Sequence, residues 1–237
     1  MIAPVPPPSA APPPADRVAA VDYTLAEHDP VDLATAALAE RDPTMAGVIE
    51  RAGPLRLRLE TNRFRMICRA ILSQQVSILS AKAIRLRFEK LLGGQRVTAA
   101  RVAELSDEQL RGAGLTRQKS RYVRVAAEAV LDGSLPLSRL GQMTDEEAMA
   151  SLTRVVGIGR WTAEMVLMFS LGRPDLFPVG DLGVRNAIAA LYQVEGWEAC
   201  ETLAELWRPH RSVATYYLWR YSDEPRNVCN GLESYPV

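Results

Sequence analysis

Two glycines and one aspartate carry the chemistry that this sequence offers. Gly157 and Gly159 flank a single apolar residue in the stretch VVGIGRW, and Asp181 stands at the expected start of a later helix. Glycines permit backbone angles that other residues avoid, and they leave amide N–H groups uncovered at the foot of the next helix, which attracts phosphate. A carboxylate before a helix is kept ionised, because the helix amides favour that form. The three residues therefore offer an anion-binding bend and a carboxylate.

Each of these residues also has a simpler explanation. Paired glycines commonly end one helix and begin the next in an ordinary helical hairpin. An aspartate before a helix is most often only its N-cap. By the same reasoning Trp161 and Trp219 would be core aromatics, and Gln74 and Gln75 would be solvated residues at a helix corner. On the residues alone these alternatives stay open.

The wider sequence resembles a known superfamily. Residues 152–185, LTRVVGIGRWTAEMVLMFSLGRPDLFPVGDLGVR, resemble the helix-hairpin-helix of DNA repair proteins. The segment 177–181, followed by Gly183 and Arg185, is similar to the signature of the helix-hairpin-helix (HhH-GPD) DNA glycosylases. Within that superfamily the sequence looks like the DNA-3-methyladenine glycosylase II, or alkylpurine, branch. The resemblance runs over roughly residues 35–223.

This resemblance implies that Asp181 is the catalytic aspartate. Hydrolysis of an N-glycosidic bond develops oxocarbenium character on the sugar, and a carboxylate beneath the deoxyribose can stabilise that charge and orient or deprotonate the attacking water. An alkylated purine already carries positive charge and leaves readily, so a strong general acid is dispensable. The expected reaction releases alkylated purines such as 3-methyladenine and 7-methylguanine from duplex DNA. The sequence does not specify the full range of lesions.

The residues expected around the flipped base are Trp161, Met165 and Trp219. Bifunctional members of the superfamily have a lysine at the position of Trp161, which attacks the sugar to form a Schiff base. Tryptophan cannot do this, so the resemblance implies a monofunctional enzyme that leaves an abasic site. The two indoles would instead present their faces to an electron-poor base. Met165 stands where relatives can have tyrosine, which leaves the surface of the pocket open.

The resemblance also assigns the contacts to DNA. Gln75, with Gln74 beside it, would fill the gap that the extracted base leaves. Phosphate contacts would come from two amides and two guanidinium groups, those of Gly157, Gly159, Arg160 and Arg185. A further set of basic side chains either extends this face or consists of ordinary solvated helix charges: Arg111, Arg117, Lys119, Arg121 and Arg124.

No cofactor is required by this chemistry. The carbonyls of Thr153, Val155 and Ile158 are spaced so that they could converge on a monovalent cation, Na⁺ or K⁺, in the hairpin. The three cysteines are too few for the four-cysteine iron–sulfur cluster of some relatives. With only two histidines, a zinc site is not expected either.

The elements that must position these residues are expected to be helices. From residue 18 onward the apolar spacing is largely helical and no segment has a strong strand period, so the predicted class is all-α. A capping box at Thr144 opens a helix-hairpin-helix at about 144–171, followed by a catalytic loop at 172–185. Thr61 is expected to cap a helix, and the alternation LRLRLE at 55–60 could be extended. The resemblance implies a two-lobed architecture with a cleft between the lobes and without the N-terminal β lobe of longer relatives.

Composition bounds the remaining expectations. Residues 1–17 form a proline-rich tail, expected to be flexible, ahead of a domain at 18–237. No apolar run approaches the roughly 18 residues that cross a bilayer, and no secretory signal is visible, so a cytoplasmic monomer acting on DNA is expected. The formal net charge is zero. DNA affinity follows the few cations that reach phosphates rather than the sum of charges, so neutrality does not exclude a DNA-binding face.

Two other functions remain to be separated from a glycosylase. The chain could be a non-catalytic helix-hairpin-helix module that only docks on the DNA backbone, or a helical interaction protein without a nucleic-acid role. Asp181, Trp161 and the two glutamines favour the enzyme. Binding to duplex DNA that falls steeply with added salt would separate both DNA-binding hypotheses from the third.

Overall fold

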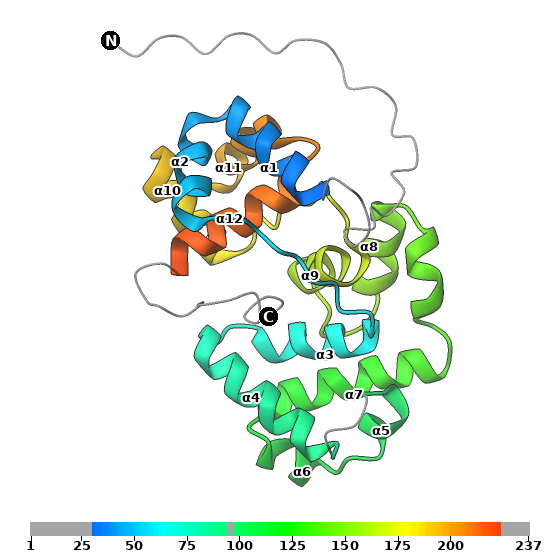
Figure 1. Ribbon diagram of the computed structural model, residues 1–237. Coiled ribbons are helices and arrows are strands. Elements are labelled where there is room, and N and C mark those ends of the chain that lie inside the picture. The colour runs from blue at the N-terminus through cyan, green and yellow to red at the C-terminus, as the bar shows by residue number, and fades with distance from the viewer. Residues whose placement is uncertain (1–29, 94–96, 224–237) are drawn as a thin grey trace.

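The structure, a computed structural model, describes residues 30–93 and 97–223 (Figure 1). Within these residues every regular element is a helix, which confirms the predicted all-α class. The alternating segment at 55–60 forms no strand. The proline-rich tail predicted at 1–17 and the third cysteine, Cys229, lie outside the described residues.

The helices fall into two groups in space (Figure 1). One group combines the two ends of the described chain: α1 (Pro30–Arg41), α2 (Pro43–Ala52), α10 (Leu182–Tyr192), α11 (Trp197–Ala204), the 3-10 helix η2 (Glu205–Trp207) and α12 (Arg211–Asp223). The other holds the middle of the chain: α3 (Arg63–Ser73), α4 (Ile78–Leu91), α5 (Ala99–Ala103), α6 (Asp107–Gly112), α7 (Arg117–Leu131), the 3-10 helix η1 (Leu137–Gln142), α8 (Asp145–Thr153) and α9 (Arg160–Leu171). The two groups agree with the expected lobes, and the cleft between them stays a prediction.

Side-chain caps set most of the helix starts. The Thr144 hydroxyl accepts from the Glu147 amide while the Glu147 carboxylate accepts from the Thr144 amide, which confirms the predicted capping box. The cap of α3 was predicted one residue too early: Asn62 rather than Thr61 accepts from the Arg65 amide. Both residue types cap well, so their spacing to the apolar stripe could not separate them.

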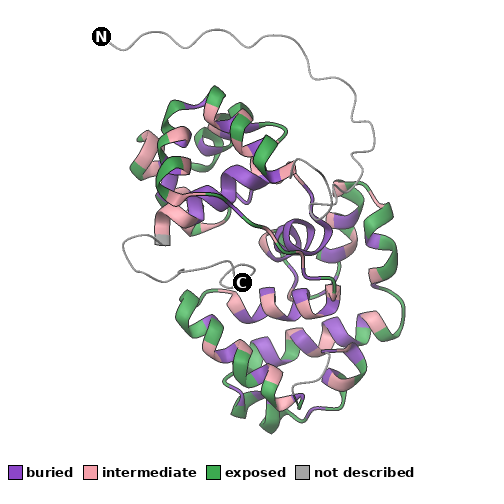
Figure 2. Ribbon diagram, in the orientation of Figure 1, coloured by how far each residue is buried: buried purple, intermediate pink, exposed green. Residues whose placement is uncertain are grey.

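Two helices, α9 and α12, are buried nearly all round (Figure 2). In α9 every residue of 162–171 is buried, and in α12 every residue of 212–219. They touch through Phe169, whose ring stacks on Trp219 at 5.8 Å between centroids and meets Tyr216 edge-on at 5.2 Å. A helix that is apolar on all sides belongs in a core, and these two join the two groups of helices.

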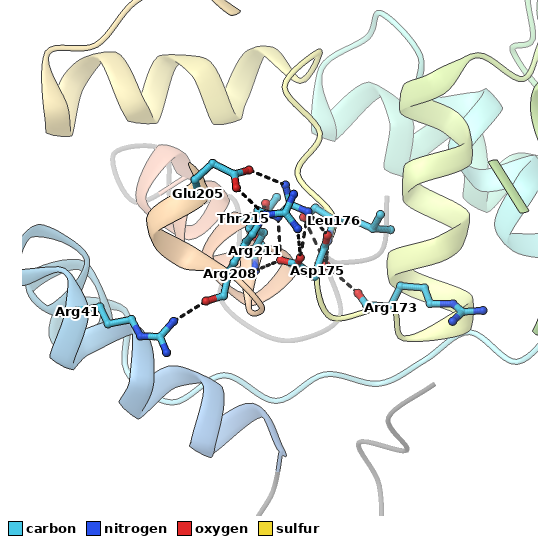
Figure 3. A network of polar contacts seen from close by, with 9 residues as sticks. Arg41, Arg173, Asp175, Leu176, Glu205, Arg208, Arg211 and Thr215 are labelled. Carbon is cyan, nitrogen blue, oxygen red and sulfur yellow. Dashed lines mark hydrogen bonds and ion pairs between the residues drawn. The ribbon is translucent and has the colours of Figure 1, made fainter. Parts of the chain in front are cut away.

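The loop between α9 and α10 is tied to the start of α12 (Figure 3). The Asp175 carboxylate pairs with Arg211 at 2.8 Å and with Arg208 at 2.9 Å. The Ser212 hydroxyl donates to the carbonyl of Arg173 at 2.7 Å, and the buried Arg173 side chain donates to a carbonyl just before α8. The polypeptide that leads to Asp181 is therefore fixed at several points.

Candidate active site and DNA interface

Asp181 is the N-cap of α10. Its backbone is extended and its Oδ1 accepts from the amide of Val184 at 3.0 Å. The side chain remains partly exposed. Capping therefore uses one lone pair of one oxygen and leaves the other oxygen for different partners.

Two tryptophans donate their indole N–H groups to this carboxylate. Trp161 Nε1 lies 2.8 Å from Asp181 Oδ2, and Trp219 Nε1 lies 3.1 Å from Asp181 Oδ1. Indole nitrogens and backbone amides can only donate, and an ionised carboxylate can only accept, so the three contacts fit the charged form of the acid. Gly183 makes room for this arrangement, because a Cβ there would come within 3.2 Å of Oδ1 and 3.5 Å of the Trp219 ring.

The three residues predicted to line the base pocket differ in exposure. Trp161 is partly exposed, whereas Trp219 is 7% exposed and Met165 is 1% exposed. One face of Trp219 is covered by the Phe169 ring that stacks on it. Of the two tryptophans that donate to Asp181, Trp161 therefore presents the more accessible ring, and the lining of a pocket by Met165 stays a prediction.

The hairpin uses its two glycines differently. Gly157 has a φ of +97°, and a Cβ there would lie 2.2 Å from the ring of Tyr122, so no other residue fits. Gly159 caps α9 with an extended backbone, φ −86° and ψ 179°, and a Cβ there would meet nothing within 4 Å. Of the two glycines, only Gly157 uses the conformational freedom that glycine permits. The lack of a side chain at Gly159 instead leaves the foot of α9 open.

The two arginines predicted to contact phosphate already have protein partners. Arg160 Nε lies 2.9 Å from the Glu164 carboxylate, and its terminal nitrogen lies 3.9 Å from Glu201. Glu164 is 3% exposed, and this burial raises its pKa to about 7, with Asp181 and Glu201 adding to the rise and Arg160 opposing it. Arg185 donates to the carbonyl of Val179 at 2.8 Å and lies over the exposed indole of Trp197 at 5.2 Å.

The wider basic cluster is only partly available to DNA. Arg111, Arg117 and Arg121 are exposed. Lys119, by contrast, is buried and donates to the carbonyl of Leu72. Arg124 turns to the carbonyl of Leu105 and the Asp107 carboxylate. Of the five residues that could have formed a basic face, only these three arginines are exposed.

The two glutamines at the α3–α4 corner point in different directions. Gln75 is exposed and has a φ of +54°, in the left-handed region that non-glycine residues seldom adopt. Gln74 turns inward, and its amide donates to the carbonyl of Gly157 and the hydroxyl of Thr162, both at 2.9 Å. Of the two, only Gln75 is exposed to solvent, and its entry into a DNA duplex stays a prediction.

The three carbonyls predicted to hold a cation lie around the bend of the hairpin. The Val155 carbonyl accepts from the Ile158 amide at 3.0 Å, which leaves it a second lone pair. Thr153 ends α8, where helix carbonyls lack intrahelical partners. The donor set of neutral oxygens fits a monovalent ion, and its binding stays a prediction.

Sequence reasoning missed Glu164 and the direction of the two indole N–H groups. Glu164 could have been noticed, since it is the one charged residue in the apolar run from Trp161 to Leu171. The indole directions had no sequence signal. They follow from the packing of α9, α10 and α12, which brings together residues 20 and 38 positions from Asp181.

Comparison with known proteins agrees with this geometry. Residues 68–211 match the model of the HhH-GPD superfamily of base excision DNA repair proteins. The DNA-3-methyladenine glycosylase 1 of Schizosaccharomyces pombe is 34% identical over 161 residues, which cover 66% of this chain and 71% of that protein. The putative DNA-3-methyladenine glycosylase YfjP of Bacillus subtilis is 32% identical over 186 residues, 75% of this chain and 65% of that relative's length.

Solved structures give the same result. The S. pombe 3-methyladenine DNA glycosylase Mag1, in complex with abasic DNA, superposes with a TM-score of 0.75 at 30% identity, covering 81% of this chain and 97% of that one. A DNA-3-methyladenine glycosidase from Bacillus halodurans gives a TM-score of 0.68 at 34% identity, over 85% of this chain and 94% of that one. The chain therefore belongs to the HhH-GPD superfamily of base excision DNA repair proteins, and within it to the branch that includes the 3-methyladenine DNA glycosylases.

Proposed function

We propose that this protein is a monofunctional DNA glycosylase that hydrolyses the N-glycosidic bond of alkylated purines in duplex DNA. The observation that carries the proposal is the Asp181 carboxylate, which three N–H donors hold beside the partly exposed indole of Trp161. The carboxylate remains partly exposed, so one of its oxygens can still face a substrate. The 3-methyladenine glycosylases among the relatives point to the same class of substrate.

The proposed reaction needs little from the protein besides charge and position. The bond between C1′ and the purine nitrogen breaks, and its electron pair neutralises the cationic base, which leaves. The positive charge that develops on the sugar is stabilised by Asp181, held in place by its N–H donors. Water then adds to C1′, and its proton passes to the carboxylate or to solvent. The products are a free base and an abasic site.

Trp161 supports the monofunctional form of this reaction. Its position is where bifunctional members of the superfamily carry the lysine that forms a Schiff base, and an indole nitrogen engaged with Asp181 cannot attack the sugar. Its accessible ring would stack on the electron-poor base. The strand would therefore remain intact after base release.

Binding to DNA would depend on a few groups at the hairpin rather than on the net charge of the protein. The open foot of α9 at Gly159 and the amides of the hairpin would hold a phosphate, with Arg160 and Arg185 nearby. The three hairpin carbonyls, of Thr153, Val155 and Ile158, would hold a Na⁺ or K⁺ ion that adds a positive charge to the same bend. No helix within residues 30–93 and 97–223 has the length and apolar character to cross a membrane. We expect a monomer that acts on DNA in the cytoplasm.

The test is release of free base from duplex DNA treated with a methylating agent, followed by chromatography. The proposal predicts free 3-methyladenine or 7-methylguanine, strand breaks only after alkali, and no covalent adduct on borohydride treatment. A borohydride-trapped adduct would contradict the monofunctional assignment. Salt-sensitive DNA binding without base release would show a non-catalytic helix-hairpin-helix module instead.

A panel of duplexes with single lesions would then define the substrate range. The panel should contain the N3- and N7-alkylpurines, hypoxanthine, ethenoadenine, 1-methyladenine and 3-methylcytosine. Because catalysis without a strong acid favours bases that carry a positive charge while still attached and leave as neutral molecules, we expect the charged alkylpurines to be released fastest. Preferential release of neutral hypoxanthine would overturn that expectation.

A further inference from the structure

The turn between α3 and α4, residues 74–77, is held in an unusual conformation. We call it the wedge turn. Gln75 at its tip is exposed, with a φ of +54°. Among the described non-glycine residues only Gln193, the C-cap of α10, shares a positive φ. Such a conformation is energetically unfavourable for a residue with a side chain and persists only where the surroundings enforce it.

The side chain of Gln74 supplies part of that enforcement. Its amide nitrogen donates to the Gly157 carbonyl at 2.9 Å and to the Thr162 hydroxyl at 2.9 Å. The first acceptor belongs to the hairpin, and the second follows Trp161 directly in α9. Thr162 is 2% exposed, so this contact is shielded from water. One side chain thus links the wedge turn to the phosphate-binding bend and to the helix that carries the base-stacking indole.

Helix α7 supports the same region from a second side. The Lys119 ammonium is buried and donates to the Leu72 carbonyl at 2.6 Å, in the last turn of α3. Burial lowers the pKa of this lysine. One turn further along α7, the ring of Tyr122 packs directly on Gly157. The end of α3 and the hairpin therefore share a common support, and the distance between them is fixed.

We infer that Gln74 is a positioning residue that holds the wedge turn in register with the hairpin, so that Gln75 enters the duplex opposite the nucleotide that the hairpin grips. The inference rests on the proposed function. It also revises the expectation that Gln74 enters the DNA beside Gln75, because both hydrogens of its amide are engaged within the protein.

The physical reason lies in the energy of base extraction. Unstacking and unpairing a nucleotide costs free energy, which the enzyme must offset with contacts made in the extracted state. A wedge that is already ordered loses no further conformational entropy on entering the duplex. A disordered wedge would have to become ordered on entry, and this entropy loss would cancel part of the free energy gained from its contacts with DNA. The contribution of Gln74 should therefore appear only when the target base is paired.

The test compares two substrates under single turnover. In the first, a 3-methyladenine analogue or 7-methylguanine lies opposite its normal partner base. In the second, it lies opposite an abasic site, where no base pair has to be broken and extraction is easier. Gln74→Met keeps the side-chain length and removes the donor. We expect it to slow release of the paired lesion about 10- to 100-fold, as for other small misplacements, and release of the unpaired lesion no more than about threefold.

Two further variants complete the test. Thr162→Val removes one of the two acceptors and should give a smaller loss with the same preference for the paired substrate; it also keeps the inference falsifiable if Gln74→Met does not fold. Gln193→Met, at the other positive-φ glutamine, should change neither rate. Equal losses on both substrates, or no loss on either, would overturn the role of Gln74. If the wild-type protein releases no base from either duplex, the proposed function itself fails.

Discussion

Two aspartates of this protein share one local design and differ in what surrounds them. Asp42 and Asp181 each stand before a helix, cap it through Oδ1, and accept an indole N–H. Asp42 is 3% exposed, and its Oδ2 accepts from both Tyr192 and Trp207, at 2.7 and 2.8 Å. Asp181 is partly exposed, and among the described residues its Oδ2 accepts only from Trp161.

The difference separates a structural acid from a candidate catalytic one. At Asp42 four donors surround the two oxygens, so the carboxylate joins α2 to α10 and η2 and has nothing left to offer a ligand. At Asp181 the donors hold the same group while one oxygen keeps a lone pair at an accessible surface. A helix-capping aspartate with an indole donor is therefore not diagnostic of catalysis. Its exposure and its unused acceptor capacity are.

The largest expected effect is on the activity of Asp181→Asn. The amide is close in shape but neutral, so it cannot stabilise the positive sugar, and its NH₂ would face the Trp161 N–H. We expect single-turnover base release to fall about 10³-fold, in the range of losses of one transition-state contact, with duplex binding retained. Normal turnover by this variant would remove the distinction between the two aspartates.

Asp42→Asn should reverse that pattern. Its NH₂ group would point at two buried donors, of which the Trp207 N–H cannot turn to accept. We expect a loss of about 2–3 kcal/mol in the free energy of unfolding, measured by urea denaturation. The folded fraction should release base at the wild-type rate. A rate loss without a stability loss would mean that Asp42 reaches the reaction.

Paired removal of the indole N–H groups sharpens the comparison further. Trp161→Phe keeps an aromatic face and removes one donor to Asp181, so we expect base release to fall about 10-fold, the value of one modest hydrogen bond in the transition state. Trp207→Phe removes the matching donor to Asp42. It should lower the unfolding free energy by about 2 kcal/mol and leave the rate unchanged. Equal kinetic effects of the two variants would contradict the assignment.

Glu164 is a third acid, buried like Asp42 but repelled by Asp181. Its folded pKa is about 7, against 4.5 for the ordinary side chain, so the folded state binds its proton more tightly than the unfolded state. Stability should therefore fall as pH rises from about 4.5 through 7, and remain lower above that. Glu164→Gln should lack this loss, so the unfolding free energy of the wild type, relative to that of the variant, should fall by about 2–3 kcal/mol between pH 5 and 8. A difference independent of pH would refute the shift.

Much of this arrangement could be predicted from the sequence, because caps, prolines and apolar spacing are local signals. The helix-hairpin-helix was predicted at about 144–171, and its helices span Asp145–Thr153 and Arg160–Leu171. Asp181 could be singled out through its loop and neighbours, whereas Asp42, directly before Pro43, has the sequence signal of a helix start and nothing more. The partners of both acids could not be predicted, since Trp207 lies 165 positions from Asp42.

The direction of side chains at helix corners could not be predicted from the sequence either. Gln74 and Gln75 are adjacent and chemically identical, yet one turns to a carbonyl 83 residues away and the other faces solvent. Lys119 looked like one more surface cation, and only packing against α3 shows that it is buried. Tertiary contacts decide the direction and burial of these side chains, and the periodicity of the sequence carries no information about such contacts.

The most direct test of the account is the affinity for a mimic of the charged sugar. Duplexes would carry either a cationic pyrrolidine or a neutral tetrahydrofuran at the position of the damaged nucleotide, and the dissociation constants would be compared for the wild type and Asp181→Asn. If the carboxylate stabilises the oxocarbenium-like sugar, the wild type should bind the cationic duplex at least about 100-fold more tightly than the neutral one, and the variant should show almost no preference. An undiminished preference for the cation in Asp181→Asn would contradict the central claim.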